Sequence, residues 1–77
     1  MQTTIAHLKK GQRAIIQNFD IDAVPLKLIE MGCLPGNMVQ VLQIAPFGDP
    51  LFLSVNESHL AIRLETASEI FVDLIEN

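Results

Sequence analysis

Several short stretches of this chain place apolar residues at every second position, a pattern typical of half-buried β-strands. The alternation is clearest where Leu51, Leu53 and Val55 share one face and Phe52 and Ser54 lie on the other. Similar apolar stretches recur along the chain and predict five strands, at 13–19, 38–44, 51–55, 59–64 and 70–75.

The stretch 38–44 departs from simple alternation. Val39 and Val41 fall on one face, whereas Leu42 and Ile44 fall on the other. Either both faces of this strand are covered, or a β-bulge shifts its register between the two pairs.

One segment has helical periodicity instead. Val24, Leu28 and Met31 recur at i, i+4 and i+7, and Leu26 and Ile29 widen the same face. This spacing predicts an amphipathic helix over 23–31, packed on the core of the sheet.

Local signals mark both ends of that helix. Asp22 is a candidate N-cap, and Pro25 falls in the first turn, where its missing N–H has no consequence. Gly32 suits the left-handed residue that often ends a helix. Pro35 and Gly36 then predict a type II turn over 34–37, with a positive φ at the glycine.

Three further connections follow from turn chemistry. Pro46 and Pro50 bracket a loop that contains Gly48 and Asp49, and proline blocks strand pairing there. The segment 56–58 predicts a hairpin connection. The segment 65–68 predicts a short helical turn with Thr66 as its cap.

Five strands and one helix within 77 residues predict a single mainly β domain over 1–77, folded as a small closed or nearly closed barrel. Hydrophobic residues make up 49% of the chain, which a domain this short needs for a sufficient core. The same apolar content makes a homo-oligomer plausible.

Charge and composition narrow the function classes. The net charge is −4, and no basic stripe with interleaved aromatic residues supports nucleic-acid binding. Neither Gly32 nor Gly36 begins a phosphate-binding loop, because no Lys-Ser or Lys-Thr pair follows. The chain has no apolar run of membrane-spanning length and no signal-peptide pattern, so we expect a cytoplasmic protein.

Catalytic and metal-binding groups are sparse. Cys33 lies between Gly32 and Leu34 with no basic neighbour to lower its pKa, so we interpret it as a small core residue. His7 and His59 have no ligand-type partner at i+3 or i+4. We therefore expect no catalytic, cofactor or metal site, and no enzyme activity.

Two aromatic residues fall outside the predicted core. Phe47 lies in the Pro46–Pro50 loop, and Phe52 lies on the minor face of its strand. Scattered exposed apolar residues are ordinary on protein surfaces, whereas a cluster indicates a partner surface. Both interpretations remain open at this point.

The order of motifs resembles the FeoA family of small proteins associated with the bacterial ferrous-iron transporter FeoB. The resemblance rests on motifs that extend from about Ile5 to Val72, namely 26–32, 34–36, the Ala-Pro-Phe-Gly-Asp-Pro-Leu run at 45–51, Leu60–Arg63 and 70–72. One departure is that 56–59 lacks the glycine often found before the Leu-Ala-Ile-Arg strand.

The resemblance implies an SH3-like barrel, with the helix inserted after the first strand, and a role in ferrous iron uptake. It implies contact with the cytoplasmic GTPase part of FeoB, and attachment to the membrane only through that partner. Glu30 is a further candidate rim charge beside the candidate contact residues, which are Leu34, Pro35, Phe47, Asp49, Pro50, Phe52 and Arg63.

Two other functions remain as alternatives. A generic SH3-like module would bind proline-rich peptides in an aromatic groove, but this chain has no Trp, no Tyr and only four Phe. A small metal-binding chaperone would have to rely on Cys33, His7, His59 and the acidic C-terminal half.

Overall fold

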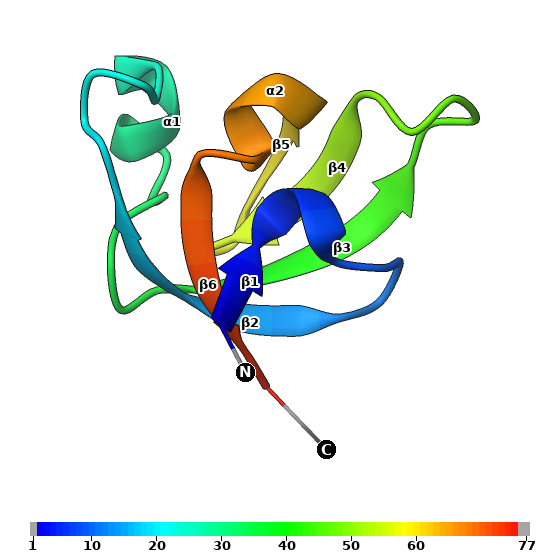
Figure 1. Cartoon of the computed structure of the whole chain (residues 1–77), viewed down its shortest axis with the longest axis horizontal. Coiled ribbons are helices and arrows are strands. Elements are labelled where there is room, and N and C mark those ends of the chain that lie inside the picture. Colours follow the sequence, from blue (N-terminus) through cyan, green and yellow to red (C-terminus); the bar gives the residue numbers. More distant parts are fainter. Residues whose placement is uncertain (1, 76–77) are drawn as a thin grey trace.

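The computed structural model describes residues 2–75, which form one antiparallel sheet of six strands in the order β1-β6-β2-β3-β4-β5 (Figure 1). The elements in chain order are β1 (Gln2–Thr4), the 3-10 turn η1 (Ile5–His7), β2 (Arg13–Phe19), α1 (Leu26–Glu30), β3 (Met38–Ile44), β4 (Leu51–Val55), β5 (Ser58–Ile62), α2 (Leu64–Ala67) and β6 (Ile70–Leu74).

The five predicted strands are confirmed, with shifts of one or two residues at some ends. The structure adds β1, which pairs with β6 through Gln2↔Asp73, Thr3↔Val72 and Thr4↔Phe71. The helix α1 therefore follows the second strand of the structure, which is the first strand that the sequence predicts.

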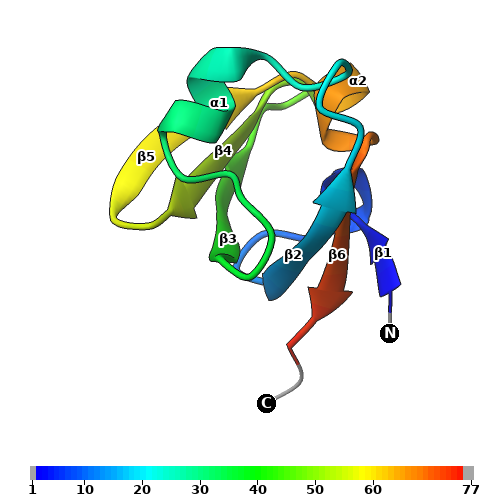
Figure 2. The same ribbon diagram turned by 90° about the vertical axis from the view of Figure 1, so that its left-hand side faces the viewer.

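The sheet curls around a single core (Figures 1 and 2). The inward residues of every strand from β2 to β6 meet there, and within residues 2–75 no polar or charged residue is buried. The largest fully buried side chains are Ile5, Ile16, Val39, Val41, Leu51, Leu53, Val55, Ile62, Ile70 and Val72. The mainly β, barrel-like architecture is thus confirmed.

A β-bulge resolves the ambiguity of β3. Val41 pairs with Leu53 and Gln43 pairs with Phe52, so the register shifts across Leu42. Val41 and Ile44 therefore both face the core side, whereas Leu42 remains partly exposed. The bulge bends the strand, which helps the sheet to curl around the core.

The helix α1 is shorter than predicted, and the predicted cap is wrong. It spans Leu26–Glu30, and Pro25 occupies the N-cap position with no side-chain cap. The backbone N–H of Asp22 instead donates to Asp20 Oδ1 at 2.9 Å, within a local turn. Leu26 is also not on the buried face, since 68% of it is exposed.

Two glycines fix the chain between α1 and β3, as predicted. Gly32 follows the helix with a φ of +108°, and Gly36 has a φ of +94°. Asn37 N–H donates to the carbonyl of Leu34 at 3.1 Å, which closes the turn over 34–37. Asn37 Nδ2 donates to the carbonyl of Gly32 at 2.7 Å and links the turn to the helix end.

A two-residue turn joins β4 to β5. Asn56 and Glu57 form it with φ values of +50° and +69°, and Val55 pairs with Ser58 across it. In two-residue hairpin turns, glycine is favoured at positions with such positive φ values.

Within residues 2–75, no helix has the length and apolar character that crossing a membrane requires.

Candidate interaction surface

The loop between β3 and β4 carries the most exposed aromatic side chain of the described residues. The loop projects from the barrel (Figure 1), and Phe47 within it is 98% exposed. Gly48 N–H donates to the carbonyl of Ala45 at 2.7 Å, and Ala45 N–H donates to the carbonyl of Pro50 at 3.1 Å. The loop is thus internally hydrogen-bonded, while Phe47 faces solvent.

Asp49 ties this loop to α2. The backbone N–H of Leu64 donates to Asp49 Oδ1 at 2.9 Å, and Arg63 Nε lies 3.7 Å from the same oxygen. The side chain of Arg63 is 80% exposed, so its ion pair adds little to stability. The main effect of Asp49 is to satisfy an N–H of the first turn of α2.

This contact corrects the predicted cap of α2. The helix begins at Leu64 rather than near Thr66, and neither Arg63 nor Thr66 caps it with a side chain. The cap comes from a residue 15 positions earlier in the chain.

Phe52 and Pro50 lie at the same end of the sheet. Pro50 directly precedes β4, and Phe52 is the second residue of that strand. Phe52 pairs with Gln43 on one side and Ala61 on the other, and it remains 40% exposed on the outer face. Asp49 and Arg63 lie at the same end, so these four residues form one group with Phe47.

Leu34 and Pro35 lie elsewhere. Both are exposed in the turn that precedes β3, whereas the Phe47 loop follows β3. The seven residues of β3 separate the turn that holds Leu34 and Pro35 from the Phe47 loop by about 20 Å at the usual rise per residue. Glu30 is exposed at the end of α1, which also precedes β3. The structure therefore divides the predicted contact residues into two groups.

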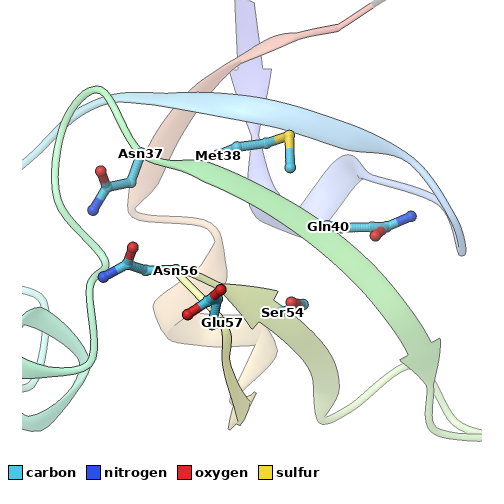
Figure 3. Close-up of a pocket in the computed structure, with 6 residues that line it drawn as sticks. All are labelled: Asn37, Met38, Gln40, Ser54, Asn56 and Glu57. Atoms are coloured by element: carbon cyan, nitrogen blue, oxygen red, sulfur yellow. The ribbon is translucent and has the colours of Figure 1, made fainter.

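A shallow hollow of about 370 Å³ lies on the outer face between β3 and the β4–β5 turn (Figure 3). Six residues line it, of which four carry an amide or hydroxyl group and one a carboxylate: Asn37, Met38, Gln40, Ser54, Asn56 and Glu57. These groups can form hydrogen bonds, but they supply neither a nucleophile–base pair nor a set of metal ligands.

Cys33 is confirmed as a core residue. It is fully buried, and burial raises the pKa of its thiol above the usual value. His7 Nδ1 lies 3.0 Å from Thr4 Oγ1, and His59 is exposed on β5. Within residues 2–75, no three His, Cys, Asp or Glu side chains are grouped closely enough to hold a metal ion.

The structure also has a groove that was not predicted from the sequence. It measures about 290 Å³, lies between α1 and β5, and is lined by Lys27, Leu28, Met31, Leu60 and Ala61. The sequence showed the amphipathic pattern of the helix α1, but it did not show that this helix lies beside the edge strand β5.

Comparison with known proteins identifies the family. The sequence matches the FeoA domain family over residues 3–74. It is 31% identical over 74 residues to an Fe(2+) transport protein A/Fe(2+) transporter FeoB fusion protein of Porphyromonas gingivalis. That match covers 95% of this chain but 9% of the fusion protein, so the chain spans less than a tenth of this curated relative.

Solved structures of FeoA proteins support the same family assignment. The FeoA protein of Chlorobium tepidum has a TM-score of 0.87 and 31% identity, over 96% of this chain and 71% of that one. A zinc-complexed FeoA of Stenotrophomonas maltophilia, described as an SH3 domain protein, has a TM-score of 0.78 and 26% identity, over 92% and 89%. The predicted SH3-like fold is thereby confirmed. The chain belongs to the FeoA family, which is associated with ferrous iron transport.

Proposed function

We propose that this protein is a non-enzymatic accessory factor of ferrous iron uptake that acts by contact with the cytoplasmic GTPase part of FeoB. The observation that carries the proposal is the fusion protein of Porphyromonas gingivalis, in which a FeoA sequence and a FeoB transporter share one polypeptide. Covalent linkage gives two modules a high effective concentration, which favours partners that work in contact.

The proposed contact surface is centred on Phe47. An exposed aromatic side chain on a loop with a fixed base can enter a partner pocket at little entropic cost. Asp49 fixes the base of the loop, and Pro50, Phe52 and Arg63 would surround the aromatic ring at the interface. Leu34 and Pro35 would join the same interface only with a partner that extends along β3.

The burial of the one cysteine is consistent with a non-enzymatic role. Cys33 is buried and its pKa is raised, so its thiol is poorly suited to act as a nucleophile. A free thiol also suits a reducing compartment, which supports a cytoplasmic location beside the GTPase part of the transporter.

The proposal is tested by iron uptake into cells and by GTP hydrolysis on the purified transporter, each with and without this chain. We expect deletion of the chain to lower Fe(2+) uptake and re-expression to restore it. Unchanged uptake, together with an unchanged rate of GTP hydrolysis when the purified chain is added, would contradict the accessory role.

A further inference from the structure

The strand β5 forms one edge of the sheet. Among residues 2–75 it pairs only with β4, and Figure 2 shows it as the outermost strand on the left. The opposite edge is β1, which has only three residues. A short edge strand is one way in which proteins limit unwanted pairing, but β5 has five residues and no such limit.

The register of the hairpin shows which backbone groups are free. Val55 and Ser58 flank a two-residue turn, and such flanking residues form a hydrogen-bonded pair. Pairs alternate along an antiparallel ladder, so the N–H and C=O groups of His59 and Ala61 point away from β4. Both residues are exposed, and within residues 2–75 neither has a further backbone partner.

The sequence of β5 lacks features that prevent another strand from pairing with its free edge. The segment Ser58–Ile62 contains no lysine, no proline and no bulge, which are three of the usual protections of an exposed edge. Two donors and two acceptors are therefore presented in the spacing of a β-strand.

The helix α1 turns this edge into a groove. The groove measures about 290 Å³, and Leu28, Met31 and Leu60 make most of its lining apolar. Lys27 is the one charged residue of that lining. A cavity of this size accepts one or two side chains of a peptide and is below the usual range for small-molecule sites.

We propose that the groove between α1 and β5 binds an extended segment of a partner protein, which adds to the sheet as a further strand beside β5. Backbone hydrogen bonds to His59 and Ala61 would hold the segment. Its apolar side chains would contact Leu28 and Met31, and an acidic side chain would lie near Lys27. The site is independent of the Phe47 surface and goes beyond the proposed function.

The test is a selection of random heptapeptides displayed on phage against the full chain, followed by NMR titration with the enriched peptide. We expect the enriched sequences to alternate apolar and polar residues and to carry an acidic residue. The bound peptide should shift the amide signals of His59 and Ala61 more than those of the Phe47 loop.

Two variants examine the geometry. Ala61→Pro removes a donor that does not face β4, so the ladder to β4 is retained, and peptide affinity should fall about tenfold. Ala61→Ser keeps the N–H and serves as the matched control, with unchanged affinity. A second pair avoids any risk to the fold: Lys27→Glu should replace acidic by basic residues in the enriched peptides, whereas Lys10→Glu, remote in sequence and exposed, should not.

Five results would overturn the proposal, the first four of which concern peptide binding. These are no enriched peptide, enriched peptides that shift only the Phe47 loop, an unchanged charge preference in Lys27→Glu, or equal affinity of Ala61→Pro and Ala61→Ser. Concentration-dependent shifts of His59 and Ala61 without peptide would assign the edge to a second copy of the chain and would also overturn it.

Discussion

Asp49 accepts a hydrogen bond from the backbone N–H of Leu64 at 2.9 Å and so connects the β3–β4 loop to the start of α2. The two residues are separated in sequence by all of β4 and β5. Because the loop is tied down at Asp49, the exposed ring of Phe47 projects from a fixed base. The same contact stabilises the fold and shapes the proposed contact surface.

Removal of the carboxylate should therefore destabilise the protein. We expect Asp49→Ala to lower the free energy of unfolding by about 1 kcal/mol, the usual cost of a lost helix cap. Asp49→Asn keeps an acceptor for Leu64 N–H and should lose less than about 0.5 kcal/mol, because the ion pair to Arg63 is largely exposed. Urea denaturation measures both, and an equal loss would show that the ion pair, not the cap, matters.

Gly32 is required for two separate reasons. Its φ is +108°, and a Cβ added there would lie 2.9 Å from the Cβ of Asn56. Gly32→Ala should therefore cost more than about 1–2 kcal/mol, the penalty of a left-handed conformation alone. Gly36→Ala is the matched control, since its φ is +94° and an added Cβ meets nothing within 4 Å.

The double variant Gly32→Ala/Asn56→Gly separates the clash from the strain. Removal of the Asn56 side chain should recover the part of the loss that exceeds that of Gly36→Ala. If the losses of Gly32→Ala and Gly36→Ala are equal in thermal or urea denaturation, the close approach to Asn56 is not energetically important.

The β4–β5 turn leaves room for stabilisation. Glu57 has a φ of +69°, and a glycine at the second position of such a two-residue turn is strongly preferred. Glu57→Gly should raise the free energy of unfolding by about 1 kcal/mol. Glu57→Ala, which removes the charge but retains the Cβ, should give no such gain in the same denaturation assay.

The strands and turns were predictable because their signals are local. The ranges 38–44 and 51–55 coincide with β3 and β4, and of the two explanations for the mixed pattern around Leu42 the structure shows the bulge. The positive φ of Gly32 and Gly36 also follows from neighbouring residues alone.

What the sequence did not reveal depends on distant contacts. The segment Gln2–Thr4 is too polar to show a strand pattern and is a strand only because β6 lies beside it. The cap of α2 comes from Asp49, far earlier in the chain, whereas the local pattern indicated Thr66. The distance between Leu34 and Phe47 depends on the path of β3, so one predicted surface became two regions.

The buried thiol gives a pH dependence with a definite sign. Burial raises the pKa of Cys33 above its ordinary value of 9.0, so the folded state keeps the proton longer than the unfolded state does. The resulting stability is complete below pH 9.0 and declines as the pH rises toward the raised value. The chain has no tyrosine to titrate in this range.

Urea denaturation between pH 7 and pH 10 tests this dependence against Cys33→Ala. The variant should be less stable at pH 7 and should show a smaller decline above pH 9. Equal declines in both proteins would mean that other groups, such as the lysines, cause the effect. In the native protein, Cys33 should also react with iodoacetamide far more slowly than in urea.

Contact between this chain and FeoB is tested most directly by a calorimetric titration of the purified cytoplasmic GTPase part of FeoB with the chain. We expect binding that Phe47→Ala weakens at least about tenfold, as for a central interface residue. Phe71→Ala is the matched control, because Phe71 is a 42% exposed phenylalanine on β6, away from the loop. Phe47 is 98% exposed, so its truncation should leave the free energy of unfolding within about 0.5 kcal/mol. Absence of binding would contradict the proposed contact with FeoB, and equal binding by both variants would contradict an interface centred on Phe47.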